Sequence, residues 1–117
     1  MDTLRPVDSS LESSITRRLV SLIREHLGNG PAGARTTVSE DVVVCVLTRP
    51  FTRAERTLLE TGRGAVAQRM RKGLHEAMRE IFVSVVEEET GRDVVGFMAD
   101  VDAPAEVAAL VFLLGDR

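Results

Sequence analysis

The sequence predicts an α+β fold: a four-stranded, mostly antiparallel sheet built from two β-hairpins, with three helices, one of them long and packed on the sheet. Two observations support this fold class. Apolar residues recur at steps of three and four in the segments expected to be helices, which is typical of amphipathic helices. Between and after these segments lie pairs of short runs rich in valine, and β-branched residues favour strands. The expected order along the chain is α-β-β-α-α-β-β.

The length of 117 residues suits one domain, which we expect over 10–115 behind a flexible N-terminus over 1–9. The single cysteine, Cys45, excludes an intrachain disulfide and suits a reducing cytosol, so we predict a cytoplasmic protein. The longest apolar run, 107–114, is far shorter than the ~20 residues that span a bilayer. We therefore expect no transmembrane segment, and any membrane role would need a membrane-protein partner.

The first helix is predicted over 10–27. Ser9 and Glu12 fit a capping box at its start, and Gly28 and Pro31 prevent its continuation. Between them runs one apolar stripe: Leu11, Ile15, Leu19, Leu22, Ile23 and Leu27.

The first hairpin is predicted over 35–47. Residues 35–40 alternate weakly and indicate a polar edge strand, and Glu40-Asp41 forms the turn. Residues 42–47 are six consecutive apolar residues, four of them valine, and form the second strand.

Two helices and a second hairpin complete the prediction. Thr52 and Glu55 form a capping box before a short helix over 53–61. A long helix follows over 65–89, with Gly91 as the residue that ends it. The second hairpin consists of strands over 94–101 and 107–114.

The strands over 42–47 and 107–114 are apolar on both faces, although a sheet with helices on one side should expose a polar second face. Something is therefore expected to cover that face: either the helix over 10–27 or an identical subunit. We predict a homodimer or a higher even oligomer. The residues expected at its interface lie on the apolar stripe of the long helix: Leu74, Met78, Ile81, Phe82 and Val85.

The long helix carries its charges in the order that its dipole disfavours, with bases first and acids last. The basic residues are Arg63, Arg69, Arg71 and Lys72, and the acids are residues 87–89. Three interpretations remain open: a solvated face, an antiparallel contact between two copies of this helix, or an anion or nucleic-acid site on the basic residues. The net charge of −3 and the aromatic content of 3% make nucleic acid an unlikely partner.

No motif for nucleotide binding, zinc hydrolysis or nucleophilic catalysis occurs, so we predict no catalytic residue and no cofactor. Asp100 and Asp102 share a strand face, and Glu106 lies across the turn; three such carboxylates could hold Mg²⁺. The simpler interpretation is that these are solvated residues at a strand end. His75 and Cys45 are expected to be structural, at the border and in the interior of the core.

Several stretches resemble a known family. Gly28-Asn29-Gly30-Pro31 after the first helix, and the run Phe51-Thr52-Arg53-Ala54-Glu55 at the start of the second, are similar to small bacterial proteins of the MpsC or YbcI type. Arg71, Thr90-Gly91 and Asp100 are similar too, so the resemblance covers about 9–114. It implies an accessory subunit or partner of a sodium-translocating, membrane-potential-generating system. It brings no catalytic residues, and Pro50-Phe51 departs from the family's usual glycine-and-leucine approach to the second helix.

Three functions follow as hypotheses. The first is a non-enzymatic, homo-oligomeric accessory module that serves a membrane ion-translocating system. The second is a small-ligand or divalent-metal-dependent enzyme that uses Asp100, Asp102 and Glu106. The third is nucleic-acid binding through the basic part of the long helix.

Overall fold

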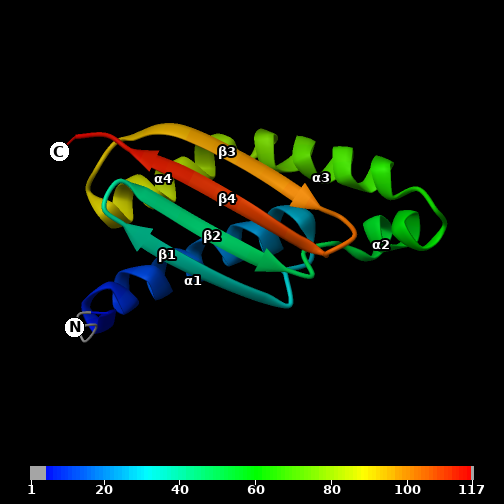
Figure 1. Ribbon diagram of the computed structural model, residues 1–117, viewed down its shortest axis with the longest axis horizontal. Helices are drawn as coiled ribbons and strands as arrows, with labels where there is room; N and C mark the ends of the chain where they lie inside the picture. The colour runs from blue at the N-terminus through cyan, green and yellow to red at the C-terminus, as the bar shows by residue number, and fades with distance from the viewer. Residues whose placement is uncertain (1–4, 117) are drawn as a thin grey trace.

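The computed structural model describes residues 5–116, which form one four-stranded sheet with helices packed against one of its faces (Figure 1). The order is α-β-β-α-α-α-β-β. The elements are α1 (Arg5–Leu27), β1 (Gly33–Ser39), β2 (Val42–Thr48), α2 (Arg53–Glu60), α3 (Gly64–Ala77), α4 (Arg79–Thr90), β3 (Val94–Asp102) and β4 (Val107–Leu114). The predicted α+β class is confirmed, but the described residues form four helices where three were expected.

The strand order in the sheet is β1-β2-β4-β3, and all three neighbouring pairs are antiparallel. The two predicted hairpins, β1–β2 and β3–β4, are confirmed, and they join through the pairing of β2 with β4. The two most apolar strands therefore lie in the centre of the sheet, and the more polar β1 and β3 form its edges.

The expectation of one helix over 65–89 is wrong, because the chain breaks at Met78 into α3 and α4. Met78 has φ −93° and ψ 4°, which lies outside the helical region, and its side chain is buried in the core. The break lets the two halves meet different neighbours: α3 packs on α2, and α4 packs on α1. The apolar stripe runs through Met78 without interruption, so periodicity gave no sign of the break.

Helix α1 begins at Arg5, earlier than the expected start at residue 10. Ser9 and Glu12 therefore lie inside the helix, and the capping box predicted from them is wrong. Glu12 Oε2 instead accepts a hydrogen bond from the backbone N–H of Val38 at 2.8 Å, which ties α1 to the edge strand β1. Of the segment 1–9 that was expected to be flexible, residues 1–4 lie outside the described part of the chain.

One hydrophobic core lies between the helices and the inner face of the sheet. Phe97 on β3 contacts Phe112 on β4 and Phe82 on α4, with ring centroids 5.1 and 6.2 Å apart. Helix α1 contributes three fully buried side chains to the same core: Ile15, Leu19 and Ile23. The helix over 10–27 was one of two candidates to cover the second face of the sheet; it packs with the other helices on the first.

Cys45 is fully buried on the inner face of β2, which confirms its predicted place in the core. Burial raises the pKa of its thiol, and a contact with Thr36 opposes this only in part. Because the thiolate is the reactive form, we expect the folded protein to resist an aromatic disulfide reagent. The thiol should react at the rate at which the chain unfolds, measured by absorbance in increasing urea. Rapid labelling without urea would contradict the buried position.

Candidate interaction surface

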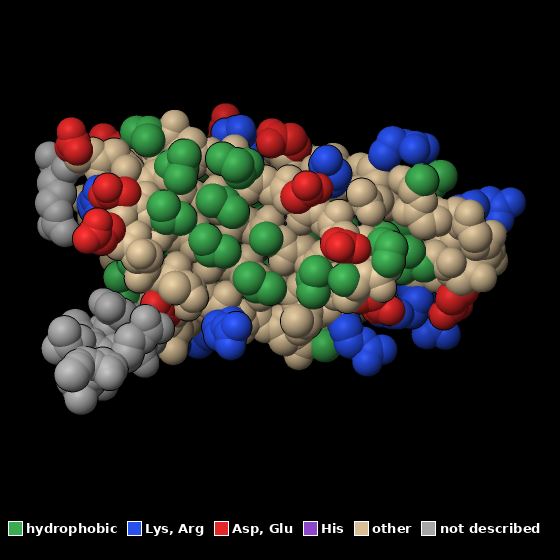
Figure 2. All heavy atoms as spheres, in the orientation of Figure 1, with side chains coloured by type: hydrophobic (Ala, Val, Ile, Leu, Met, Phe, Trp, Pro, Cys, Tyr) green, Lys and Arg blue, Asp and Glu red, His purple; other side chains and the backbone are tan. Residues whose placement is uncertain are grey.

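The outer face of the sheet carries apolar side chains that no described segment of the chain covers. Figure 1 shows α1 and α4 behind the sheet, α3 along its β3 edge and α2 beyond one end, and Figure 2 shows hydrophobic side chains gathered over the middle of the front of the sheet. The side chains on this surface, which we name the open sheet face, are Val42, Val44 and Val46 on β2, Met98 on β3, and Val107, Ala109, Val111 and Leu113 on β4. Met98 is 53% exposed and Val46 36%.

The strand register arranges this face in rows that run across all four strands. In one row Arg35 pairs with Val46, Val46 with Ala109, and Ala109 with Asp100. Paired residues of neighbouring strands project to the same side of a sheet, so all four side chains lie on the open face. Each row therefore begins on β1, crosses the apolar centre and ends on β3.

The two edges of the open sheet face differ in charge. On β1 the outward residues are Arg35, Thr37 and Ser39, all exposed. On β3 the exposed acids Asp100 and Asp102 stand at the end of the strand. The face thus has an apolar centre, one edge with a basic residue and one acidic edge, a distribution that suits a protein contact with a polar rim.

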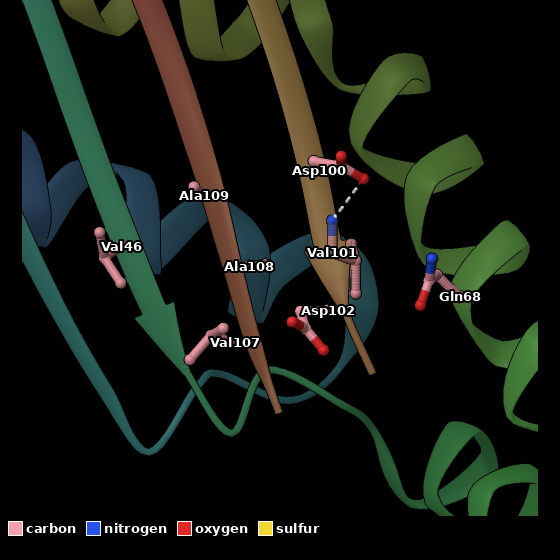
Figure 3. A pocket seen from close by; sticks show the side chains of 8 residues that line it. All are labelled: Val46, Gln68, Asp100, Val101, Asp102, Val107, Ala108 and Ala109. Carbon is pink, nitrogen blue, oxygen red and sulfur yellow. Dashed lines mark hydrogen bonds between the residues drawn. The ribbon is translucent and has the colours of Figure 1, made fainter. Parts of the chain in front are cut away.

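A depression of about 570 Å³ lies at the end of this face where Asp100 and Asp102 stand (Figure 3). Its walls come from β2, β3 and β4, and only Gln68 reaches it from a helix. The Asp100 carboxylate accepts a hydrogen bond from the Val101 N–H, and Gln68 Oε1 accepts one from Ala103. The depression is therefore a continuation of the open sheet face.

A buried ion pair joins α2 to α3. Arg71 Nη2 and Nε donate to the two carboxylate oxygens of Glu55 at 2.6 and 3.0 Å, and both side chains are fully enclosed. Burial acts to raise the pKa of Glu55, but hydrogen bonds from Arg71 and from the Thr52 N–H outweigh it and hold this pKa below its usual value. Glu55 also completes the predicted capping box with Thr52, which is confirmed.

His75 lies one turn after Arg71, and its ring is fully buried against Phe82. Neither ring nitrogen has a hydrogen-bond partner among the described residues. Burial, and then the positive charge of Arg71, lower the pKa of His75 from 6.5 to about 4, although Glu55 opposes them. The imidazole is therefore neutral at neutral pH and acts as a core residue.

Four of the five residues expected at an oligomer interface belong to the chain's own core or pack against it. Met78, Phe82 and Val85 are buried in the chain's own core, and Leu74 and Ile81 are half-buried. The acidic end expected to meet a second copy of the helix is also occupied, because Arg18 on α1 binds Glu88 and Glu89 at 2.7 and 3.0 Å.

The four predicted anion-binding residues do not form one patch. Arg71 is buried on Glu55, and Arg63 Nη1 donates to the carbonyl of Thr61. Lys72 Nζ lies 3.4 Å from Asp100 Oδ1. Arg69, the fourth residue, is exposed on α3.

The three predicted metal ligands are also held apart. The Asp100 carboxylate is bound by Lys72 and by Val101, and Asp102 accepts from the Ala105 N–H within the turn. Glu106 forms an ion pair with Arg56 at 3.0 Å. Among residues 5–116, no three acidic, histidine or cysteine side chains gather as a metal-binding set.

The buried ion pair was missed by sequence reasoning, although a signal for it was present. Arg71 stands four residues before His75 and seven before Met78, so it shares the spacing of the apolar stripe. An arginine on a buried stripe needs an acidic partner, and Glu55 was the residue already expected at a helix start. The open sheet face, in contrast, follows directly from the two strands that are apolar on both faces.

The comparisons with known proteins identify the family. A family model described as "Na+-translocating membrane potential-generating system (MpsC)" matches residues 8–116, and neither a curated protein nor a solved structure matches the chain. Across residues 5–116, no helix has the length and apolar character needed to cross a bilayer. With the match extending over nearly the whole chain, this protein belongs to the MpsC family.

Proposed function

We propose that this chain is a non-enzymatic accessory module that acts as a homodimer, with the open sheet face of each copy packed on the other. The observation that carries the proposal is the row of apolar side chains on β2 and β4 that the chain's own helices leave uncovered. Contiguous apolar patches of this kind are rare on monomeric proteins and mark contact sites.

The size of the face supports this proposal. Four strands of about eight residues give a footprint of about 500 Å² on each subunit. Two such footprints reach the lower bound of about 1,000 Å² for a biological interface. Sheets that pack face to face lie about 10 Å apart and interlock their side chains, and valine-rich strands provide the branched side chains for this packing.

The family description supplies the process that the module serves. It names a sodium-translocating system that generates a membrane potential. We propose that the dimer is a cytoplasmic accessory partner of a membrane protein in such a system, which the absence of a candidate membrane span in residues 5–116 allows.

The dimer is tested with two matched valine variants. Val46 on the open sheet face is 36% exposed and Val66 on α3 is 41% exposed. A charge cannot be buried cheaply in an apolar contact, so Val46→Lys should raise the dimer dissociation constant about tenfold or more. Val66→Lys should leave it unchanged. Light scattering over a concentration series measures both. A wild-type chain that is monomeric throughout the micromolar range would overturn the proposal.

The accessory role is tested in cells with a potential-sensitive dye. Deletion of the gene should lower the membrane potential, and the wild-type chain and Val66→Lys should restore it. Val46→Lys should fail to restore it if the dimer is the active form. A membrane potential unaffected by the deletion would contradict the proposed accessory role, but it would not contradict the proposed dimer.

A further inference from the structure

We infer that the two subunits pair around a two-fold axis parallel to the strands, so that Arg35 of each copy lies opposite Asp100 of the other. The inference rests on the proposed dimer and names its geometry. A two-fold contact uses the same patch on both subunits, so every contact it makes occurs twice.

The strand register places the two charges for this pairing. Arg35 and Asp100 stand at opposite ends of one row, separated by Val46 and Ala109. A two-fold axis parallel to the strands, lying between the two sheets, places each row over the same row of the partner subunit with the order of the strands reversed. The edge strand β1 then faces β3 of the partner, and β2 faces β4. At each end of the apolar row, Arg35 of one subunit therefore lies opposite Asp100 of the other.

The other aligned arrangement has its axis across the strands, and it lays each strand over its own copy. The two ends of every strand are also exchanged in this arrangement, so an axis across the middle of the sheet sets Arg35 over Thr37 of the partner subunit and Asp100 over Met98 of the partner subunit. Neither charge then meets an opposite one, and a charge packed on an apolar side chain without a partner is disfavoured. Complementary charges, in contrast, fix the orientation of a complex. The distribution of charge on the face thus selects the axis parallel to the strands.

Both charged groups are available for this contact. The Asp100 side chain is 77% exposed, and it forms an ion pair with Lys72 at 3.4 Å, where the lysine is itself 49% exposed. Exposed pairs of this kind contribute little stability, and a carboxylate can accept from two cations. Lys72 therefore does not compete strongly with Arg35 of a second subunit for the Asp100 carboxylate. The Arg35 side chain is also exposed.

Charge reversal gives a sharp test because each single variant should disfavour its own homodimer. Arg35→Asp places two acids opposite each other at both ends of the dimer, and Asp100→Arg places two bases there. Each change should raise the dimer dissociation constant about tenfold or more. The double variant, with the charges exchanged, should return it close to the wild-type value.

Mixing the two single variants should produce a heterodimer in which both charge pairs are complementary. Native mass spectrometry of chains with different isotope labels would count heterodimers against homodimers, and we expect the heterodimer to dominate. As a matched control, Arg69→Asp changes an exposed arginine on α3 by the same charge, and mixed with Asp100→Arg it should give no such preference.

The outcomes separate this inference from the proposed function. If the wild type forms a dimer that Val46→Lys disrupts, but the charge variants mix statistically, the axis is wrong and the proposed dimer remains. If the wild type is monomeric, both fail together. A dominant heterodimer supports both when each single variant also weakens its own homodimer and the double variant recovers, because Arg35 must then lie opposite Asp100 of the other subunit.

Discussion

Replacement of Glu55 by Gln should lower the free energy of unfolding by about 3 to 5 kcal/mol, because the positive charge of Arg71 would remain in the core without its acid. Both side chains are almost completely enclosed: Arg71 is 0% exposed and Glu55 1%. The arginine cannot shed its proton in a protein, so no change of ionisation relieves the cost. Urea denaturation followed by far-UV circular dichroism measures the loss.

Two further variants separate the buried charge from other effects of the substitution. Arg71→Met combined with Glu55→Gln removes both charges, and it should recover part of the lost stability because no unpaired ion is left. As an exposed control, Glu88→Gln breaks the surface pair with Arg18 and should change stability by less than about 1 kcal/mol. Equal losses in Glu55→Gln and Glu88→Gln would contradict the burial of the pair.

The pair also explains why the structure needs α2 and α3 as separate helices. Glu55 lies in the first turn of α2 and Arg71 in the middle of α3, so the bond fixes two helices joined by the turn at Gly62. Gly62 has φ 79°, which favours glycine, and it allows the sharp return. Helix α2 has eight residues and would be marginal alone, so its anchor on α3 contributes to its stability.

Periodicity predicted the class of each element because the burial of one helix side or of alternate strand residues leaves a local pattern. The strands over 42–47 and 107–114 even predicted an uncovered second face. Strand order was not accessible in the same way, because the pairing of β2 with β4 brings together residues that are 59 to 71 positions apart. The partner of Arg71 lies only 16 positions away, but the pairing depends on how α2 folds back on α3, which periodicity does not report.

The break at Met78 shows the limit of a continuous pattern. A straight helix and a bent one can bury the same stripe, so sequence spacing does not distinguish them. The bend follows from the neighbours that each half meets, α2 for α3 and α1 for α4. The same stripe was assigned to a contact with a second copy, while the structure places Met78, Phe82 and Val85 in the chain's own core.

Acid should destabilise the fold through His75 before it affects the carboxylates. The pKa of His75 is about 4 in the folded chain and 6.5 as its ordinary value, so the folded state holds the neutral ring. The stability from a group with a lowered pKa is fully present above its unfolded pKa and is lost as the pH falls. Between pH 7 and pH 5 we expect a loss of about 2 kcal/mol, at 1.36 kcal/mol for each pH unit below the unfolded pKa.

This pH range isolates the histidine from the ion pair beside it. The pKa of Glu55 lies below its ordinary value of 4.5, so its contribution is lost only at lower pH. His75→Leu should therefore make stability nearly independent of pH between 7 and 5, measured by urea denaturation at each pH. His26, exposed on α1, is the matched control, and His26→Gln should keep the wild-type loss. If His75→Leu kept that loss as well, the loss would come from another group. The wild-type His75 ring would then have the same pKa in the folded and unfolded chain and would ionise in the folded core, which would contradict its burial beside Arg71.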